Sequence, residues 1–132
     1  MGNQISFIDA AHDAAIEWAD GILATPPGQV LILDTETTGL DSCAEIIQLA
    51  MIDLGGNEIM NTMVHPKFAI PPDATRIHGI TDAMVAGAPF WSDIAPRFEE
   101  LTKGKTLVIY NAAFDLRLLR QTYQISQVPY VL

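Results

Sequence analysis

Apolar and polar positions alternate along the chain with two different periods, and these periods predict its elements. Apolar residues recur at helical spacing over residues 6–24, and the prolines and glycine at 26–28 end that helix. An uninterrupted apolar run then predicts a buried strand over 30–34. We expect the helix to pack on the domain, with binding to a partner as the alternative. The pattern divides the chain into an N-terminal helix and linker at 1–29 and a domain at 30–132.

The rest of the pattern predicts a hairpin followed by alternating helices and strands. The hairpin over 45–54 and 58–64 fits the two glycines that separate its strands. Further along, the pattern predicts a short helix at 74–77, a turn or helix capped by Thr81, a helix at 90–102, a strand at 106–110, a helix at 114–123 and the beginning of a strand at 128–132. Three antiparallel strands followed by helix–strand–helix alternation indicate an α/β fold with a mixed sheet.

Composition places the chain among globular proteins. With 132 residues, 49% of them hydrophobic, it has enough apolar surface for one folded domain. No apolar run approaches the roughly 20 residues that span a bilayer, and the first residues lack the pattern of a secretory signal. The single cysteine, Cys43, fits a reducing compartment. We therefore expect a cytoplasmic protein that does not associate with membranes.

The charge balance restricts how the chain binds nucleic acid. A net charge of −9, from 16 acids and 7 bases, argues against a protein that coats nucleic acid through a broad basic surface. It is compatible with an enzyme that grips only the end of a strand, where metal ions, backbone donors and stacking surfaces suffice. We expect weak, non-processive binding unless a partner supplies basic surface.

Three carboxylates are candidates for a metal site. Asp34 and Glu36 follow the first apolar run, and side chains two positions apart on a strand point to the same side. Because two such acids repel each other, a hard divalent cation is their natural complement. Asp115 begins the helix after the 106–110 strand, at the edge where α/β proteins usually build sites. We expect the three carboxylates to converge and to support metal-dependent phosphoryl chemistry.

Three stretches in the chain, taken in order, are similar to motifs of one enzyme superfamily. They run from Asp34 to Leu40, from Arg76 to Thr81 and from Asn111 to Asp115. Together they resemble the DEDD 3′–5′ exonucleases, which include the proofreading epsilon subunits of bacterial DNA polymerase. The resemblance implies a ribonuclease H-like fold, and its Ile-His-Gly-Ile-Thr segment favours the His-dependent (DEDDh) subgroup.

The resemblance also implies a reaction and its cofactors. The reaction is the release of nucleotides from a DNA 3′ end, single-stranded or frayed, by two-metal hydrolysis. Two Mg²⁺ or Mn²⁺ ions would be held by Asp34, Glu36 and Asp115. These three residues are thus the candidate catalytic residues and metal ligands.

Four further residues are candidates for substrate binding. Thr37 and its neighbours would hydrogen-bond the terminal nucleotide through backbone amides, and Leu40 would lie as a wedge beside its base. His78 matches the family segment that contacts the terminal nucleotide. Phe114 has two open interpretations, a stacking platform for a base or a core side chain. Arg117 and Arg120 are interpreted as ordinary surface charges, with phosphate contact as the alternative.

The sequence departs from the resembled family after Asp115. The family pattern requires a fourth acid preceded by a His or Tyr general base, and no Asp, Glu or His follows Asp115. We expect a domain that is incomplete at its C-terminus, with slow or absent turnover, since a general base contributes about 10²–10⁴-fold. Apolar sheet surface would then be uncovered, which favours self-association or a partner such as a polymerase.

Two other functions stay open. One is RNA trimming by an oligoribonuclease-like enzyme, since the contacts to the 2′-hydroxyl that separate RNA from DNA are not visible in the sequence. The other is a non-catalytic module that binds nucleic-acid ends or a partner protein. The missing acid and base favour the second alternative, whereas the carboxylate cluster favours an enzyme.

Overall fold

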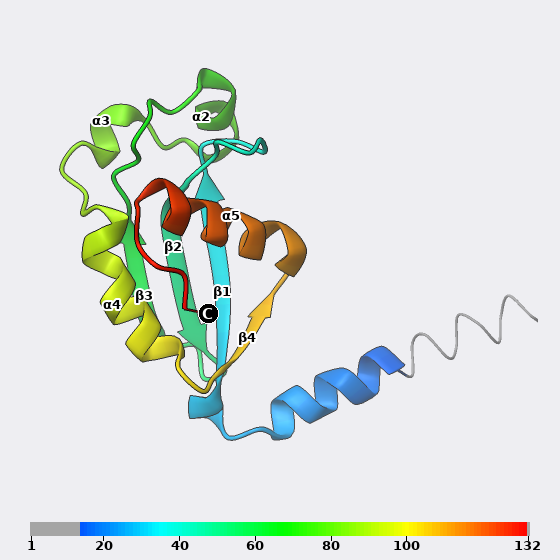
Figure 1. The fold of residues 1–132 in the computed structure, drawn as a ribbon. Coiled ribbons are helices and arrows are strands. Elements are labelled where there is room, and N and C mark those ends of the chain that lie inside the picture. The colour runs from blue at the N-terminus through cyan, green and yellow to red at the C-terminus, as the bar shows by residue number, and fades with distance from the viewer. Residues whose placement is uncertain (1–13, 132) are drawn as a thin grey trace, which may run out of the picture.

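A computed structural model describes residues 14–131 and shows a four-stranded mixed sheet with helices (Figure 1). The strands lie in the order β3-β2-β1-β4, where β1 is Val30–Thr37, β2 is Ile46–Asp53, β3 is Glu58–Met63 and β4 is Thr106–Ile109. The first three strands are antiparallel, and β4 runs parallel to β1. The predicted α/β fold with a mixed sheet is confirmed.

The first strand is longer than the hydrophobic pattern indicated. We predicted that it ends at Asp34, but β1 continues to Thr37. The reason is that its pairing with β2 does not stop at the acids, because Asp34 lies opposite Ala50 and Glu36 opposite Gln48. Both acids therefore lie within the strand rather than at its end.

The helices follow the predicted order with small shifts in their bounds. They are a short 3-10 turn η1 (Pro27–Gln29), α2 (Pro72–His78), α3 (Asp82–Val85), α4 (Trp91–Thr102) and α5 (Ala112–Ile125). Thr81 caps α3 as predicted, since its hydroxyl accepts a hydrogen bond from the amide of Met84. His78, one residue beyond the helix predicted at 74–77, is the last residue of α2.

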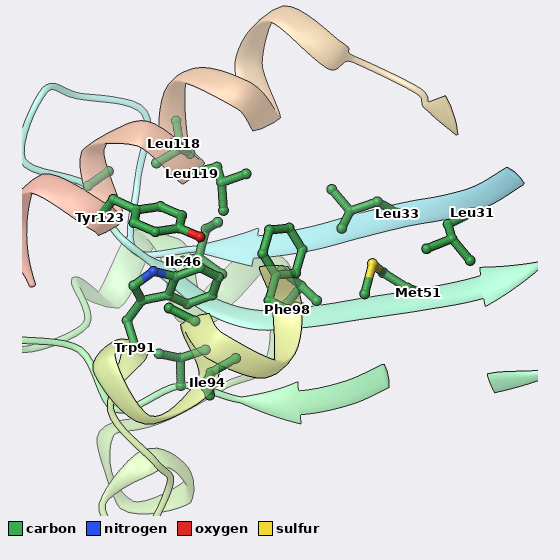
Figure 2. Packing of buried hydrophobic residues seen from close by; sticks show 14 residues of the cluster. Leu31, Leu33, Ile46, Met51, Trp91, Ile94, Phe98, Leu118, Leu119 and Tyr123 are labelled. Atoms are coloured by element: carbon green, nitrogen blue, oxygen red, sulfur yellow. The ribbon is translucent and has the colours of Figure 1, made fainter. Parts of the chain in front are cut away.

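The main core lies between one face of the sheet and the helices α4 and α5. Figure 2 shows the rings of Trp91 and Phe98 of α4 and of Tyr123 of α5 close together, with Leu33 of β1 to one side of them. The indole of Trp91 meets the ring of Tyr123 nearly edge-on, at 5.3 Å between centroids. Burial of this face fixes the side on which each β1 side chain lies.

A smaller apolar cluster joins α2 and α3 to the sheet. It consists of Ile47, Ile70, Ala74, Ile80 and Val85. Ile47 comes from β2, whose pairing with β1 shifts register between Glu36 and Thr37. The cluster thereby holds the short helix α2 beside the C-terminal end of β1.

The opposite face of the sheet carries exposed apolar side chains. Ile32 and Ile52 lie directly opposite each other on β1 and β2, and they are 37% and 39% exposed. Exposed apolar surface on the sheet was expected, and this pair provides it.

Two predictions at the ends of the chain are wrong for the described residues. Residues 128–131 are not a strand, because the chain turns after α5 and Tyr130 packs edge-on against Tyr123, with ring centroids 5.2 Å apart. Residues 14–24 are helical, but none of them is buried, so the expected packing on the domain is absent there. Instead the segment before η1 directs this helix away from the sheet (Figure 1). The predicted helix residues 6–13 lie outside the described part.

No helix within residues 14–131 is both long and apolar enough to cross a membrane.

Candidate active site

Alternation along β1 distributes the residues of the first motif over two faces of the sheet. Leu33 is buried in the core under α5, so Thr35 shares that face. Asp34 and Glu36 lie on the opposite face, where Asp34 is exposed and Glu36 is half-buried. Within residues 14–131, neither carboxylate has an ion pair or a side-chain hydrogen bond. The two acids share a face as predicted.

Asp115 lies on the core side of the sheet, in the first turn of α5. It is only 7% exposed, and the hydroxyl of Thr35 donates a hydrogen bond to its Oδ1 at 2.6 Å. The helix N-terminus also favours a negative charge at this position. Thr35 was not among the predicted site residues. It can be identified from the alternation of side chains along β1. Because Asp34 and Glu36 lie on one face of the sheet, the residue between them must lie on the face that α5 covers.

The expected convergence of three carboxylates is not seen in this structure. Nowhere in the described residues do three His, Cys, Asp or Glu side chains group as metal ligands would. The physical reason is the alternation of β1, which separates Asp34 and Glu36 from the face that α5 covers. The pair on β1 fits a hard divalent cation in its donor chemistry, since both are carboxylates without a competing cationic partner.

A cleft of about 430 Å³ lies at the C-terminal end of β1. It is bounded by the β1–β2 loop, α2 and the start of α5. The predicted residues that line it are Glu36, Thr37, Leu40, His78 and Phe114. Residues of three segments far apart in the sequence thus meet at one cleft, whereas Asp34 and Asp115 do not line it.

The mouth of the cleft is apolar. Leu40 is 76% exposed and Ile77 is 85% exposed, although both are large aliphatic residues. Ile77 was not predicted, and the available signal was its place beside His78 within the second motif. Phe114 is half-buried and also packs against the core cluster, so both interpretations of this residue describe part of its environment.

His78 uses both of its ring nitrogens within the protein. Nδ1 accepts a hydrogen bond from the amide of Ile80 at 3.0 Å, so in the neutral ring the proton is on Nε2. Nε2 then donates to the carbonyl oxygen of Thr37 at 3.0 Å. His78 therefore joins α2 to the end of β1, and any contact with a substrate is left to its ring face or carbon edge.

Tyr123 has no access to the cleft. Burial raises the pKa of its hydroxyl above the ordinary value, and the hydrogen bond that it donates to Glu99 Oε1 at 2.9 Å raises it further. A fully buried neutral phenol in the core is not a general base for this cleft.

The family comparison covers most of the chain. The model of the exonuclease family RNase_T matches residues 31–129. An uncharacterized exonuclease, CP81, of Escherichia phage 186 is 49% identical over 92 residues, which are 70% of this chain and 47% of the phage protein. The epsilon subunit of DNA polymerase III from Buchnera aphidicola is 35% identical over 105 residues, covering 72% of this chain and 45% of that subunit. The chain thus spans about half the length of these relatives.

Solved structures agree with the fold. Exonuclease X in complex with 5′ overhanging duplex DNA matches with a TM-score of 0.55 and 36% identity, covering 67% of this chain and 52% of that one. Escherichia coli exonuclease I with a dT13 oligonucleotide matches with a TM-score of 0.62 over 72% of this chain and 23% of that one, and at 23% identity it supports the fold alone. The ribonuclease H-like fold and the exonuclease resemblance are confirmed. With its three ordered motifs, its mixed sheet and the match over residues 31–129, the chain belongs to the RNase T exonuclease family.

Proposed function

We propose that this chain is a 3′–5′ exonuclease domain that removes nucleotides from DNA 3′ ends. The observation that carries the proposal is the cleft at the end of β1, where residues of all three motifs meet in a member of the exonuclease family. The 5′ overhanging duplex DNA bound by exonuclease X, which is 36% identical, supports DNA as the substrate. The epsilon subunits among the relatives support association with a polymerase.

Asp34 and Glu36 are the residues that would hold a divalent cation. Mg²⁺ and Mn²⁺ are the ions that suit two carboxylates without cationic partners. When bound, such an ion lowers the pKa of its water and stabilises the leaving oxygen. Asp115 stays the predicted third ligand, and two ions stay the predicted number.

The chain's own side chains would bind and orient the substrate. Leu40 and Ile77 offer aliphatic surface to the terminal base at the mouth of the cleft, and Phe114 adds an aromatic edge. The carbonyl of Thr37 is occupied by His78, so the contact proposed for Thr37 is made by its amide. Acidic surface elsewhere on the molecule favours brief, non-processive binding.

The test measures release of nucleotides from a 3′-labelled single-stranded DNA with Mn²⁺, together with Mn²⁺ affinity by calorimetry. Asp34→Asn removes one ligand charge with little change in shape, and we expect it to abolish release and to weaken Mn²⁺ binding at least tenfold. Glu100→Gln on the exposed surface of α4 is the control and should behave like the wild type. Equal Mn²⁺ affinity and equal release in Asp34→Asn would contradict the proposal.

A further inference from the structure

Arg117 touches two of the residues that form the cleft. Its Nη2 donates a hydrogen bond to the carbonyl oxygen of Leu40 at 2.8 Å, and its guanidinium carbon lies 5.5 Å from the centroid of the Phe114 ring. The second distance is within the range of a cation–π interaction. A side chain that the sequence pattern marks as an ordinary surface charge therefore connects the loop after β1 with the start of α5.

Gln121, one turn further along α5, extends this connection. Its Nε2 donates to the carbonyl oxygens of Asp41 at 3.0 Å and of Ala44 at 3.1 Å. Its Oε1 accepts a hydrogen bond from Nη1 of Arg117 at 2.8 Å. The two side chains thus bind three carbonyls of the β1–β2 loop and orient each other.

The far end of the same loop is fixed independently. The hydroxyl of Thr38 accepts from the amide of Glu45 at 2.9 Å, and the buried carboxylate of Glu45 accepts from the amides of Lys67 and Phe68. Leu40 lies between these anchors, with its side chain exposed at the mouth. Arg117 is the residue that binds the carbonyl of Leu40 itself, next to the bonds that Gln121 makes to Asp41 and Ala44.

We propose that Arg117 is a positioning residue of the cleft, which holds Leu40 and Phe114 in the arrangement that receives a 3′-terminal base. The guanidinium suits this role because its planar fork donates in two fixed directions while one face rests on a ring, which a lysine ammonium does not reproduce. The inference rests on the proposed function, since it concerns binding of a 3′ end. Two of the five N–H donors of Arg117 are engaged within the protein, which favours positioning over phosphate contact as its main role.

The first test compares affinities for a single-stranded oligonucleotide that carries 2-aminopurine at its 3′ end and a hydrolysis-resistant phosphorothioate linkage before it. Arg117→Ala should weaken binding by about tenfold, because Leu40 and Phe114 must then be ordered when the 3′ end binds, and Arg117→Lys should recover only part of the loss. Arg120→Ala is the matched control, since Arg120 lies on the same helix over the ring of Tyr130. It should change affinity less than twofold. Thermal unfolding of each variant checks that it folds.

The second test separates positioning from two other roles. If Arg117 acts through Leu40, then Arg117→Ala should cost little more in a Leu40→Ala background than Leu40→Ala alone. The salt dependence of binding should keep its slope, whereas loss of a phosphate contact would reduce the slope by about one. Additive losses of affinity in the double variant, a reduced salt slope, or wild-type affinity of Arg117→Ala would each overturn this inference and leave the proposed function standing. Failure of the wild type to bind the 3′ end would overturn the proposed function, and the inference with it.

Discussion

Side chains at the end of β1 determine how the cleft is assembled. Thr35 binds Asp115 on the helix-covered face, while the carbonyl of Thr37, two residues later, binds His78 on α2. Two alternate residues of one strand therefore bind two helices at residues that lie 80 and 41 positions away in the sequence. The cleft follows from these few hydrogen bonds, because each joins a different element to the same strand.

Tyr123 gives a prediction at the residue scale. Burial and the bond to Glu99 raise its pKa above the ordinary 10.0, so the neutral hydroxyl stabilises the folded state fully below pH 10. That contribution is lost as pH rises from 10 toward the folded pKa, where the unfolded chain ionises first. Urea unfolding at pH 8 and pH 11 should show that Tyr123→Phe loses less stability between these values than the wild type. An equal loss in both proteins would contradict this.

Short elements depend on their ends more than on their length. Helix α2 has only seven residues, and it ends at Gly79 in the left-handed conformation with φ of 76°. That conformation brings the amide of Ile80 to Nδ1 of His78. The helix end and the hydrogen bond to Thr37 therefore depend on the same backbone geometry.

Gly79→Ala tests the end of this element. A Cβ at Gly79 would meet no atom within 4 Å, so the cost is that of the backbone alone, about 1–2 kcal/mol. We expect the urea midpoint to fall accordingly and 3′-end binding to weaken, because His78 shifts with the helix end. Gly28→Ala, where a Cβ also has open space and φ is not positive, is the control and should leave both quantities near the wild type. A neutral Gly79→Ala would contradict the role of the helix end.

At the scale of the whole molecule, the helical residues 14–24 lie outside the buried cores. None of them is buried, whereas the cores are built from Val30 onward. Trp18 and Leu23 are 61% and 70% exposed, so we expect Trp18→Ala with Leu23→Ala to change the free energy of unfolding by less than about 0.5 kcal/mol. Urea unfolding of the double variant checks this. A loss of several kcal/mol would mean that the N-terminal segment packs on the domain, as the sequence pattern first suggested.

Much of the fold is predictable from local patterns. The hairpin, α4 and the Thr81 cap depend on residues close together in the chain, and the motif residues of the cleft were found because their order is informative. The continuation of β1 past Asp34 to Thr37 was missed, because polar residues interrupt the apolar run while backbone pairing with β2 continues. Pairing partners are not visible in the strand's own sequence.

The remaining differences depend on contacts between distant residues. The apolar residues near Tyr130 suggested a strand, but an edge-on contact with Tyr123 places that segment differently. Arg117 was interpreted as a surface charge because its partner is a main-chain carbonyl 77 residues away, which no side-chain pattern encodes. Asp34 and Glu36 lie apart from Asp115 because side chains alternate along β1. This can be deduced only when it is known which face of the sheet α5 covers.

The exposed isoleucines on β1 and β2 affect more than packing. Ile32 precedes Asp34 by two positions on the same face, so the water that surrounds the isoleucines also surrounds the acids. Two charges about 7 Å apart, the spacing of alternate strand positions, repel by about 0.6 kcal/mol in bulk water and about 2.4 kcal/mol at an effective dielectric constant of 20. Cation affinity at the acid pair is therefore governed by how wet this face of the sheet is.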